Sequence, residues 1–271
     1  KTLKSHLVVS VPVLHLVFAV FVFMLTASHC LCLMALVTLQ STDRFVANSA
    51  EIFQQYGVRM EVGYDFDLYR EMLSVARPDQ PLGAPFDPDV HELTAENALW
   101  MIGRNIQGEI IHTQALRMLD MKGRSVAEYF TARFRDFPPA VPGLDLKRSR
   151  FRAGPYAKRL RGTTCYNGEF WIKPGETTFR GQGLSCVLGR YAFFQALQHW
   201  DPDQMIGFMA QAVACKGFPQ RLGWMHTQPG ALRWFMKGRD TPMEGFMTFM
   251  EREDLHYVLE LPLKDYVALA A

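Results

Sequence analysis

The residues best suited to chemistry lie in one stretch, where an apolar strand pattern is followed by a glycine-rich turn and a strongly amphipathic helix pattern. The turn and the start of the helix comprise six consecutive residues: Arg180, Gly181, Gln182, Gly183, Leu184 and Ser185. Such a turn directs several backbone N–H groups toward one point, and the helix N-terminus adds partial positive charge. Glycines allow close backbone approach, and an arginine donates paired hydrogen bonds to an anion. The stretch predicts a pyrophosphate cradle, although a plain strand-to-helix connection uses similar residues.

This stretch does not fit the common nucleotide-binding loops. It contains no GxxxxGK[ST] sequence, and the GxGxxG pattern fails because its last position is Cys186. It resembles instead the acyl-CoA-binding signature of the GNAT superfamily of N-acetyltransferases, Gln/Arg-x-x-Gly-x-Gly/Ala. The residues from Arg180 to Leu184 follow the common form Arg-Gly-x-Gly-hydrophobic, whereas Ser185 replaces the last small residue. The spacer that precedes Arg180, counted from Pro174, is longer than is usual in the family.

The order of the neighbouring elements is also similar to that family. A hairpin pattern (residues 99–117) precedes the stretch, and a short strand pattern and the sequence Arg-Leu-Gly-Trp (residues 221–224) follow it. The resemblance covers roughly residues 45–260, and only residues 180–185 are specific. It implies an α/β (α+β) fold with a mixed, mostly antiparallel central sheet flanked by helices. It also implies acetyl-CoA or another acyl-CoA as co-substrate, with Ile172 and the six residues of the turn as its binding residues.

The resemblance further implies direct attack of an amine on the thioester. The pantetheine arm would lie between two diverging parallel strands, Glu169–Lys173 and Met205–Met209. A base removes the amine proton and an acid can protonate the thiolate. Glu169 is the first candidate for the base, with a solvated edge charge as the competing interpretation. The family's usual acid, a tyrosine, corresponds to Pro219, so the general acid is open.

The composition bounds the possible functions. The 271 residues are 49% hydrophobic and 21% charged, which is typical of a globular protein. The 29 Lys and Arg residues against 27 Asp and Glu residues give a net charge of +2, which argues against a dedicated nucleic-acid binder. Five cysteines without a CxxC pair argue against a disulfide framework or a structural zinc site. We expect no resident metal.

The N-terminal residues differ from the rest of the chain. No charged residue occurs from Ser5 to Thr42, which predicts an apolar segment over residues 1–40 and an acyltransferase domain over 41–271. Residues 7–39 could anchor the chain in a membrane, although the run is long for one span and contains Pro12. Alternatively, the functional protein starts near Met34 and residues 1–33 are a non-native extension. The resemblance implies a cytoplasmic protein, and the anchor leaves membrane association open.

Periodicity predicts the remaining elements. In chain order these are a helix ending near residue 55, a strand at Val58–Tyr64, a helix at Asp65–Ala76, a loop at Arg77–Asp89, hairpin strands at Ala98–Gly103 and Glu109–Leu119, a helix at Ser125–Phe134, irregular chain at Phe137–Leu160, a strand at Thr163–Lys173, the strongest helix at Gly183–Trp200, a strand at Met205–Met209, a helical pattern at Gln211–Leu222, strands at Trp224–Thr227 and Gly245–Met250, and a possible sheet extension at Leu255–Leu261.

A basic stretch has no assigned role. Between Asp145 and Glu169 there is no acid, and the bases are Lys147, Arg148, Arg150, Arg152, Lys158, Arg159 and Arg161. A solvated loop is the simplest interpretation. The alternatives are a clamp on the 3′-phosphate of CoA, a site for an acidic acceptor, and contact with an anionic membrane surface.

The sequence therefore predicts acyl transfer from acyl-CoA to a small-molecule amine. One rival is a synthase of long-chain N-acyl amino acids or acyl-homoserine lactones, for which the 20 Phe and 14 Met residues suit an acyl-binding cleft. The rival from another class is a non-catalytic acyl-CoA-binding or membrane-associated protein. The sequence does not specify the acceptor, the acyl length or the oligomeric state.

Overall fold

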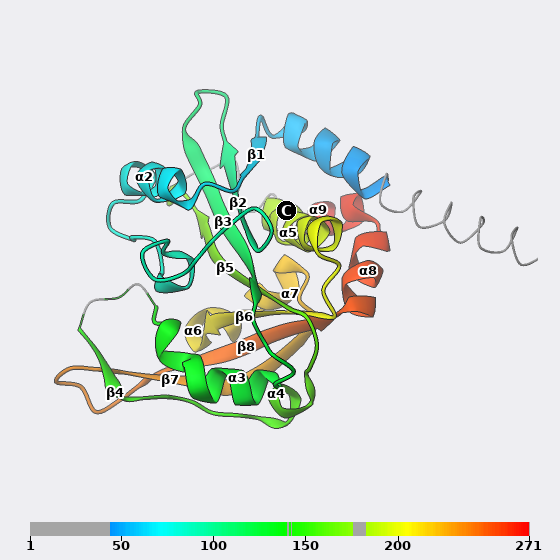
Figure 1. The fold of residues 1–271 in the computed structure, drawn as a ribbon. Coiled ribbons are helices and arrows are strands. Elements are labelled where there is room, and N and C mark those ends of the chain that lie inside the picture. Colours follow the sequence, from blue (N-terminus) through cyan, green and yellow to red (C-terminus); the bar gives the residue numbers. More distant parts are fainter. Residues whose placement is uncertain (1–43, 140, 142, 176–182, 271) are drawn as a thin grey trace, which may run out of the picture. The chain divides into compact units, whose positions relative to one another are not determined.

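The computed structural model describes residues 44–139, 141, 143–175 and 183–270. The chain divides into two units, Lys1–Arg44 and Phe45–Ala271, and the fold below is that of the second. Its described residues form one eight-stranded sheet in the order β1-β2-β3-β5-β6-β8-β7-β4 (Figure 1). The strands are β1 (Arg59–Gly63), β2 (Ala98–Arg104), β3 (Ile110–Leu119), β4 (Leu144–Phe151), β5 (Thr164–Ile172), β6 (Gln204–Ala210), β7 (His226–Met236) and β8 (Met243–Glu251).

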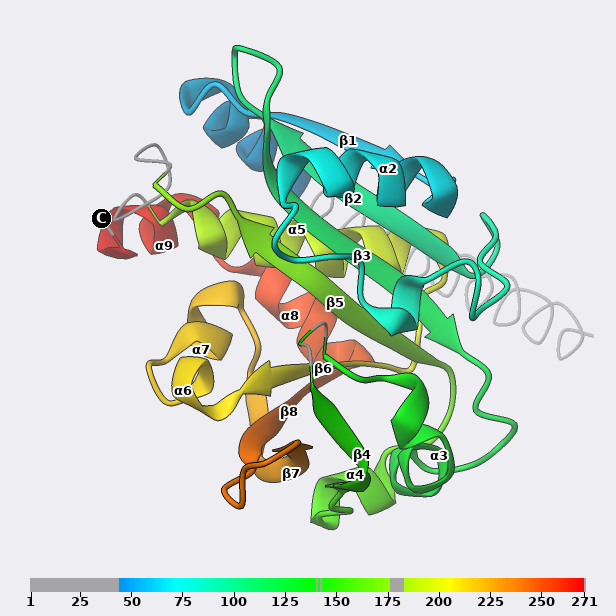
Figure 2. The same cartoon turned by 90° about the vertical axis from the view of Figure 1, so that its left-hand side faces the viewer.

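Helices cover both faces of the sheet. We call the side that packs against α2, α3 and α4 the first face, and the side that packs against α5, α7, α8 and α9 the second face (Figure 2). Residues 44–55 form a further helix, whose Phe45, Ile52 and Phe53 join the core of the second face. The helices are α2 (Phe66–Ala76), α3 (Val126–Arg133), α4 (Pro155–Arg159), α5 (Leu184–His199), α6 (Gln211–Ala214), α7 (Phe218–Leu222), α8 (Arg252–Glu260) and α9 (Leu263–Ala270), with 3₁₀ turns η1 (Ala84–Phe86) and η2 (Phe134–Asp136).

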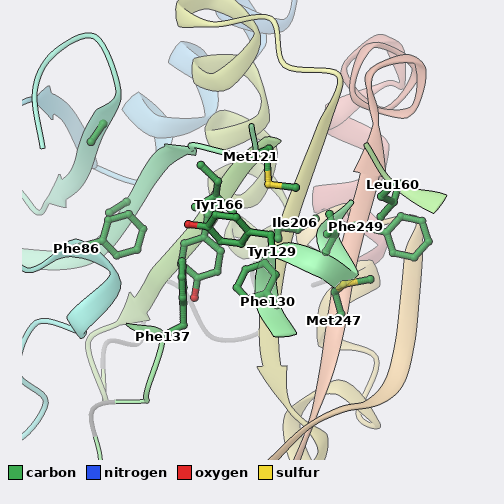
Figure 3. Packing of buried hydrophobic residues seen from close by; sticks show 14 of the residues in the cluster. Phe86, Met121, Tyr129, Phe130, Phe137, Leu160, Tyr166, Ile206, Met247 and Phe249 are labelled. Atoms are coloured by element: carbon green, nitrogen blue, oxygen red, sulfur yellow. The ribbon is translucent and has the colours of Figure 1, made fainter. Parts of the chain in front are cut away.

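Alternation along the central strands builds both cores. In β5 the side chain of Cys165 joins the core of the second face, and that of Tyr166 joins the core of the first face. The first face is rich in aromatic rings: Tyr166 packs edge-to-face on Phe137 with ring centroids 5.1 Å apart, and Phe137 packs on Phe130 at 4.8 Å (Figure 3). Such ring pairs stabilise a core beyond the area that they bury. The sheet at the centre of the molecule is therefore held firmly from both sides.

The parallel pair β5 and β6 is the feature that positions the site. The other strand pairs of the sheet are antiparallel. Pairing of β5 with β6 runs from Thr164 opposite Gln204 to Asn167 opposite Gly207 and then stops, although β5 continues to Ile172 and β6 to Ala210. Figure 2 shows the two strands separating toward their C-terminal ends. The predicted parallel, diverging pair is thus confirmed, as is the mixed, mostly antiparallel sheet flanked by helices.

Most predicted elements are confirmed, and the exceptions have local causes. The region Phe137–Leu160 is not irregular, because it contains the edge strand β4 and the short helix α4. The stretch Leu255–Leu261 does not extend the sheet. It belongs to α8, where Leu255 and Val258 are buried three residues apart and Glu251 and Asp254 form a reciprocal cap.

Two further elements differ in length from the prediction. The helical pattern Gln211–Leu222 is divided into α6 and α7, because Gly217 lies between them in the left-handed region with φ of 73°. The strand β7 begins at His226 and runs to Met236, well past the predicted end at Thr227, since a register shift between Gln228 and Leu232 absorbs Pro229 and Gly230. Within the described part of the chain, no helix has the length and apolar character needed to cross a membrane. Residues 7–39 lie outside that part.

Candidate functional site

A cleft opens where β5 and β6 diverge. It has a volume of about 460 Å³ and is lined from both faces of the sheet, a size typical of small-molecule sites. Its first-face wall includes Phe137, Tyr166, Gly168, Glu169, Phe208, Leu232 and Trp234, and its second-face wall includes Asn167, Phe170, Met209, Phe218, Leu222 and Trp224. The cleft therefore passes through the sheet.

A β-bulge in β5 shapes the edge of this cleft. Ala115 of β3 lies opposite Gly168 and Thr113 lies opposite Trp171, so β5 carries one residue more than β3 in this interval. Glu169 occupies the bulge with φ of 59°, a left-handed conformation that is uncommon for a residue other than glycine. Beyond the bulge, Phe170 packs on Phe218 of the second face with ring centroids 5.6 Å apart. The bulge thus turns Glu169 toward the first face.

Three contacts hold residue 169 in place. The buried guanidinium of Arg77, which follows α2, forms an ion pair with the carboxylate through Oε2. The backbone N–H of Gly83 donates to Oε1 at 3.1 Å, and the hydroxyl of Thr113 donates to the backbone carbonyl of Glu169 at 3.0 Å. The side chains of Arg77 and Glu169 are 1% and 12% exposed. The prediction of a solvated edge charge is therefore wrong, because the carboxylate is largely buried at the cleft wall. Its role as a base stays a prediction.

The carboxylate contacts also fix the loop that follows α2. Gly83 lies at the start of η1, and Pro85 of the same turn accepts a hydrogen bond from Arg117 of β3 through its carbonyl oxygen. Both Gly83 and Pro85 line the cleft. Because removal of one partner of a buried ion pair leaves an unpaired charge, at a typical cost of roughly 3–5 kcal/mol, substitution of Arg77 or Glu169 alone should destabilise this wall of the cleft.

Tyr166 is a candidate that sequence reasoning missed. It lies on β5, three residues before Glu169, and lines the cleft. Burial raises the pKa of its phenol above the ordinary range, as does the nearby charge of Glu169. The phenol therefore keeps its proton at neutral pH, and the raised pKa makes it a weaker acid than an exposed tyrosine. In the sequence, Tyr166 looks like any inward-facing aromatic of a strand, and only its place in the lining of the cleft makes it a candidate.

The predicted phosphate cradle is only partly within the described residues. Arg180, Gly181 and Gln182 lie outside them. Gly183 caps α5 with φ of 69°, and the helix starts at Leu184. The side chain of Leu184 is buried in the core, so its contribution to a ligand can only be its backbone N–H. Ser185 is half-buried, and Ile172 is a partly buried residue at the end of β5. A helix begins where a pyrophosphate was expected, and its first N–H groups have no partner within the helix.

Several polar residues with their own partners lie outside the cleft. The imidazole of His226 bonds to Asp254 at 2.9 Å and stacks on Phe249. Asp203 accepts hydrogen bonds from the backbone N–H and the hydroxyl of Thr163. Among the described residues, no group of His, Cys, Asp and Glu side chains could hold a metal ion.

Pro219 and Cys215 do not supply a proton donor to the cleft. Pro219 is buried in the first turn of α7, and its side chain has no proton to give. Cys215 is exposed at the end of α6 and is not among the residues that line the cleft. The general acid that the resemblance implies therefore stays open.

The basic stretch lies on β4, on α4, on the chain that joins them and, for Arg161, on the chain that follows α4. β4 is the last strand of the described sheet and pairs only on one side, with β7. Arg148 forms an ion pair with Asp240, and Arg161 forms one with Glu128. Charged side chains on an edge strand oppose pairing with other chains. A charged edge of the sheet explains this stretch without a ligand, and the 3′-phosphate clamp stays a prediction.

Comparison with known proteins gives likenesses of structure alone. No family model matches the sequence, and no curated protein matches it. An N-acetyltransferase from Staphylococcus aureus Mu50 is similar in structure, with 10% sequence identity and a TM-score of 0.39 over 72% of this chain and 98% of that chain. Arabidopsis thaliana NAA60 in complex with acetyl-CoA has 9% identity and a TM-score of 0.41 over 72% of this chain and 98% of that chain. A chimera of the Vibrio cholerae spermidine N-acetyltransferase SpeG and hSSAT has 9% identity and a TM-score of 0.43 over 73% of this chain and 98% of that chain. At these identities and scores, the likeness says nothing about the substrate of this chain.

Proposed function

We propose that this chain is an acyl-CoA-dependent N-acyltransferase that moves an acetyl or other acyl group to a small amine by direct attack on the thioester. The observation that carries the proposal is the cleft between the diverging strands β5 and β6. Leu184, the first residue of α5, shares a core cluster with Ile172 at the end of β5. Diverging parallel strands leave backbone groups unpaired along an open slot, and a helix N-terminus attracts an anion. Together they suit a long ligand that has a phosphate-bearing end and a reactive end.

The acyl-CoA would enter from the second face. Its pyrophosphate would bind at the start of α5, with Gly183, Leu184 and Ser185 joined by Arg180, Gly181 and Gln182 of the preceding turn. Its pantetheine arm would continue past Ile172 into the slot. The fit rests on the left-handed Gly183 at the helix start and on the volume of the cleft. Both features favour a ligand of this length and charge over a compact one.

The chain's own side chains can serve the two proton transfers of such a reaction. Glu169 would accept the proton that the amine loses when its nitrogen bonds to the thioester carbon. Tyr166 would donate a proton to the thiolate when the carbon–sulfur bond breaks. Each transfer accelerates a reaction by roughly 10²–10⁴-fold when the group is well placed. Direct transfer otherwise depends on positioning, which the fixed walls of the cleft supply.

A specific observation also favours the non-catalytic alternative. The position of the family's usual acid is the buried Pro219, and a protein that binds acyl-CoA without turning it over would need no acid. Release of free CoA separates the two functions. We expect the purified chain to bind acetyl-CoA, to release CoA only when an amine is present, and to form the N-acetyl product, detected by mass spectrometry. Binding of acetyl-CoA without CoA release across a broad amine panel would leave a sensor as the function.

A further inference from the structure

We propose that the acceptor is a lipophilic primary amine that carries no acid group. This inference rests on the proposed function and specifies the substrate class of the same cleft. It argues against amino-acid-like acceptors, which the sequence left open. Two properties of the cleft walls carry it, namely their charges and the apolar surface beside Glu169.

The charged residues of the cleft wall are acids. Glu169 and Glu244 line the cleft, and the described lining residues include no Lys, Arg or His. Each acid pairs with an arginine that is not part of the lining, Glu169 with Arg77 and Glu244 with Arg233, whose Nε lies 2.8 Å from Oε1. The second carboxylate oxygen of Glu244 is buried without a hydrogen-bond partner within the described structure.

An acceptor that carried a carboxylate would place it among these acids. The arginines behind the wall, Arg77 and Arg233, are already paired with these acids, so the described wall offers an incoming carboxylate no free cation. An ammonium group meets a different situation, because one carboxylate oxygen of Glu244 has no hydrogen-bond partner within the described structure. The charge of the wall therefore selects for amines and against amino acids.

The first-face wall beside Glu169 is apolar and rigid. It is formed by Phe137, Tyr166, Phe208, Leu232 and Trp234. Trp234 stacks on Phe134 with ring centroids 4.2 Å apart, and Phe208 packs edge-to-face on Phe130 at 4.9 Å. Rings fixed by such contacts keep their shape when a ligand binds. An apolar group attached to the amine would bury its surface against this wall, whereas a polar amine would leave the wall in contact with water.

The apolar wall lies on the side where the amine must arrive. Glu169 turns toward the first face, whereas α5, at whose start the pyrophosphate would bind, packs on the second face. The acyl-CoA therefore occupies the slot from one side, and the acceptor reaches the slot from the other. A long acyl chain is a second possible source of apolar contact, and the experiment separates the two.

The first test uses acceptors that differ by one group. With acetyl-CoA and the wild-type chain, 2-phenylethylamine should have kcat/KM roughly 10²-fold above that of phenylalanine, which differs from it by the carboxylate. Phenylalaninamide controls for the lower basicity of an α-substituted amine and should exceed phenylalanine clearly. Methylamine, which lacks the apolar body, should be poorer than 2-phenylethylamine through KM. Equal or better use of phenylalanine would overturn the inference.

The second test places a cation on the wall. Met243 lines the cleft opposite Trp234 in the β7–β8 pair and is 39% exposed, so Met243→Lys adds a charge without opening the core. We expect kcat/KM for 2-phenylethylamine to fall roughly tenfold and that for phenylalanine to rise. Met225→Lys is the matched control, because Met225 is 43% exposed and lies outside the cleft lining. Equal responses of the two variants would also overturn the inference.

The failure of this inference can be distinguished from failure of the proposed function. If kcat/KM for transfer to amines does not depend on the carboxylate or the phenyl group of the acceptor, the inference is wrong and the proposed acyltransferase activity is supported. If the chain binds acetyl-CoA but transfers the acetyl group to no amine, the proposed function is wrong. A third result, in which octanoyl-CoA raises kcat/KM with methylamine while the phenyl group has no effect, would assign the apolar wall to the acyl chain and overturn the inference.

Discussion

Glu169 combines an uncommon backbone conformation with a buried ion pair, and both depend on residues far away in the chain. Its φ of 59° is held by the contacts of Arg77, Gly83 and Thr113. Residues kept in sparsely populated conformations cluster at functional sites, because the surrounding structure must compensate for the strain. A purely structural contact with the loop after α2 would not require the side chain of Glu169 to lie at the edge of the cleft.

We predict that Glu169→Gln lowers kcat roughly 10²-fold or more near neutral pH, because an amide cannot accept the proton of the amine. The affinity for CoA, measured by calorimetry, should change little, since the substitution leaves the start of α5 untouched. Activity equal to that of the wild type would contradict a role as base.

A control is needed because Glu169→Gln can also lower the stability of the folded protein. Glu169→Gln leaves the guanidinium of Arg77 buried with a weaker partner, which can cost a few kcal/mol. The double variant Arg77→Met with Glu169→Gln removes the buried charge as well. If loss of the base is the cause, the double variant should regain stability toward thermal unfolding without regaining kcat. Recovery of kcat with stability would show a structural role.

His112 gives a prediction about acid stability. The imidazole is 0% exposed, its Nδ1 donates to the carbonyl of Trp171 at 2.9 Å, and burial lowers its pKa to about 4. Because the unfolded value is about 6.5, the unfolded chain binds a proton first as the pH falls. The free energy of unfolding should therefore decrease between pH 6.5 and 4, by at most about 3 kcal/mol from this group.

Denaturant unfolding at several pH values checks this expectation. His112→Gln should flatten the pH dependence in that range, whereas His256→Gln, which removes an exposed imidazole, serves as the control. His91 adds a smaller contribution of the same sign, because burial and the charge of Arg117 lower its pKa to about 4 but solvent screens a half-buried group. An unchanged slope in His112→Gln would mean that other groups dominate the acid transition.

At the scale of elements, the start of α5 is the feature most open to test. Gly183 has φ of 69°, a conformation in which a Cβ atom is disfavoured by roughly 1–2 kcal/mol. We predict that Gly183→Ala weakens binding of CoA about tenfold or more, because the helix start must shift its N–H groups away from the phosphates. Calorimetry with CoA measures the loss.

Substitution of a second left-handed glycine separates the effect of backbone strain from the effect on ligand binding. Gly108, in the turn between β2 and β3, has φ of 82° and open space around its Cα. Gly108→Ala imposes comparable backbone strain far from α5, so it should lower stability without changing the affinity for CoA. If Gly183→Ala binds CoA as the wild type does, the turn is only a connection between strand and helix.

The elements were more predictable from the sequence than the contacts between them. The alternation in Val58–Tyr64 and the helical spacing in Gly183–Trp200 reflect one buried face each, and both appear in the structure as β1 and α5. β4 was missed because its Lys and Arg side chains, exposed on an edge strand, hide the alternation of Leu144 and Leu146. β1 is also an edge strand, but its Met60 and Val62 pack against the core of the second face, so its alternation shows in the sequence.

Only the part of the site that lies within one segment of the chain was predictable from the sequence. A single segment carries the strand, turn and helix start that suggested a phosphate cradle. The ion pair between Arg77 and Glu169 joins residues 92 positions apart, and no spacing in the sequence indicates it. The bulge at Glu169 is also invisible in the sequence, since the residue with positive φ is not a glycine. Tyr166 becomes a candidate only once it is known to line the cleft.

At the scale of the whole molecule, ligand binding should couple to stability. A ligand present at 100 times its dissociation constant stabilises a folded protein by about 2.7 kcal/mol, or roughly 2–4 °C in Tm for each kcal/mol in a domain of this size. We predict that acetyl-CoA raises Tm by several degrees. S-acetylpantetheine, which lacks the pyrophosphate, should do so far less at equal concentration. Equal shifts would place the binding energy in the slot and not at α5.

The lining of the cleft by both faces of the sheet has a consequence for the kinetic order of the proposed reaction. In the proposed arrangement the acyl-CoA is held from the second face and the acceptor approaches from the first face, so we expect either substrate to bind while the other is present. No acylated form of the protein is needed, because donor and acceptor can meet inside the slot within one ternary complex. Products can likewise depart in opposite directions, without one waiting for the other to leave.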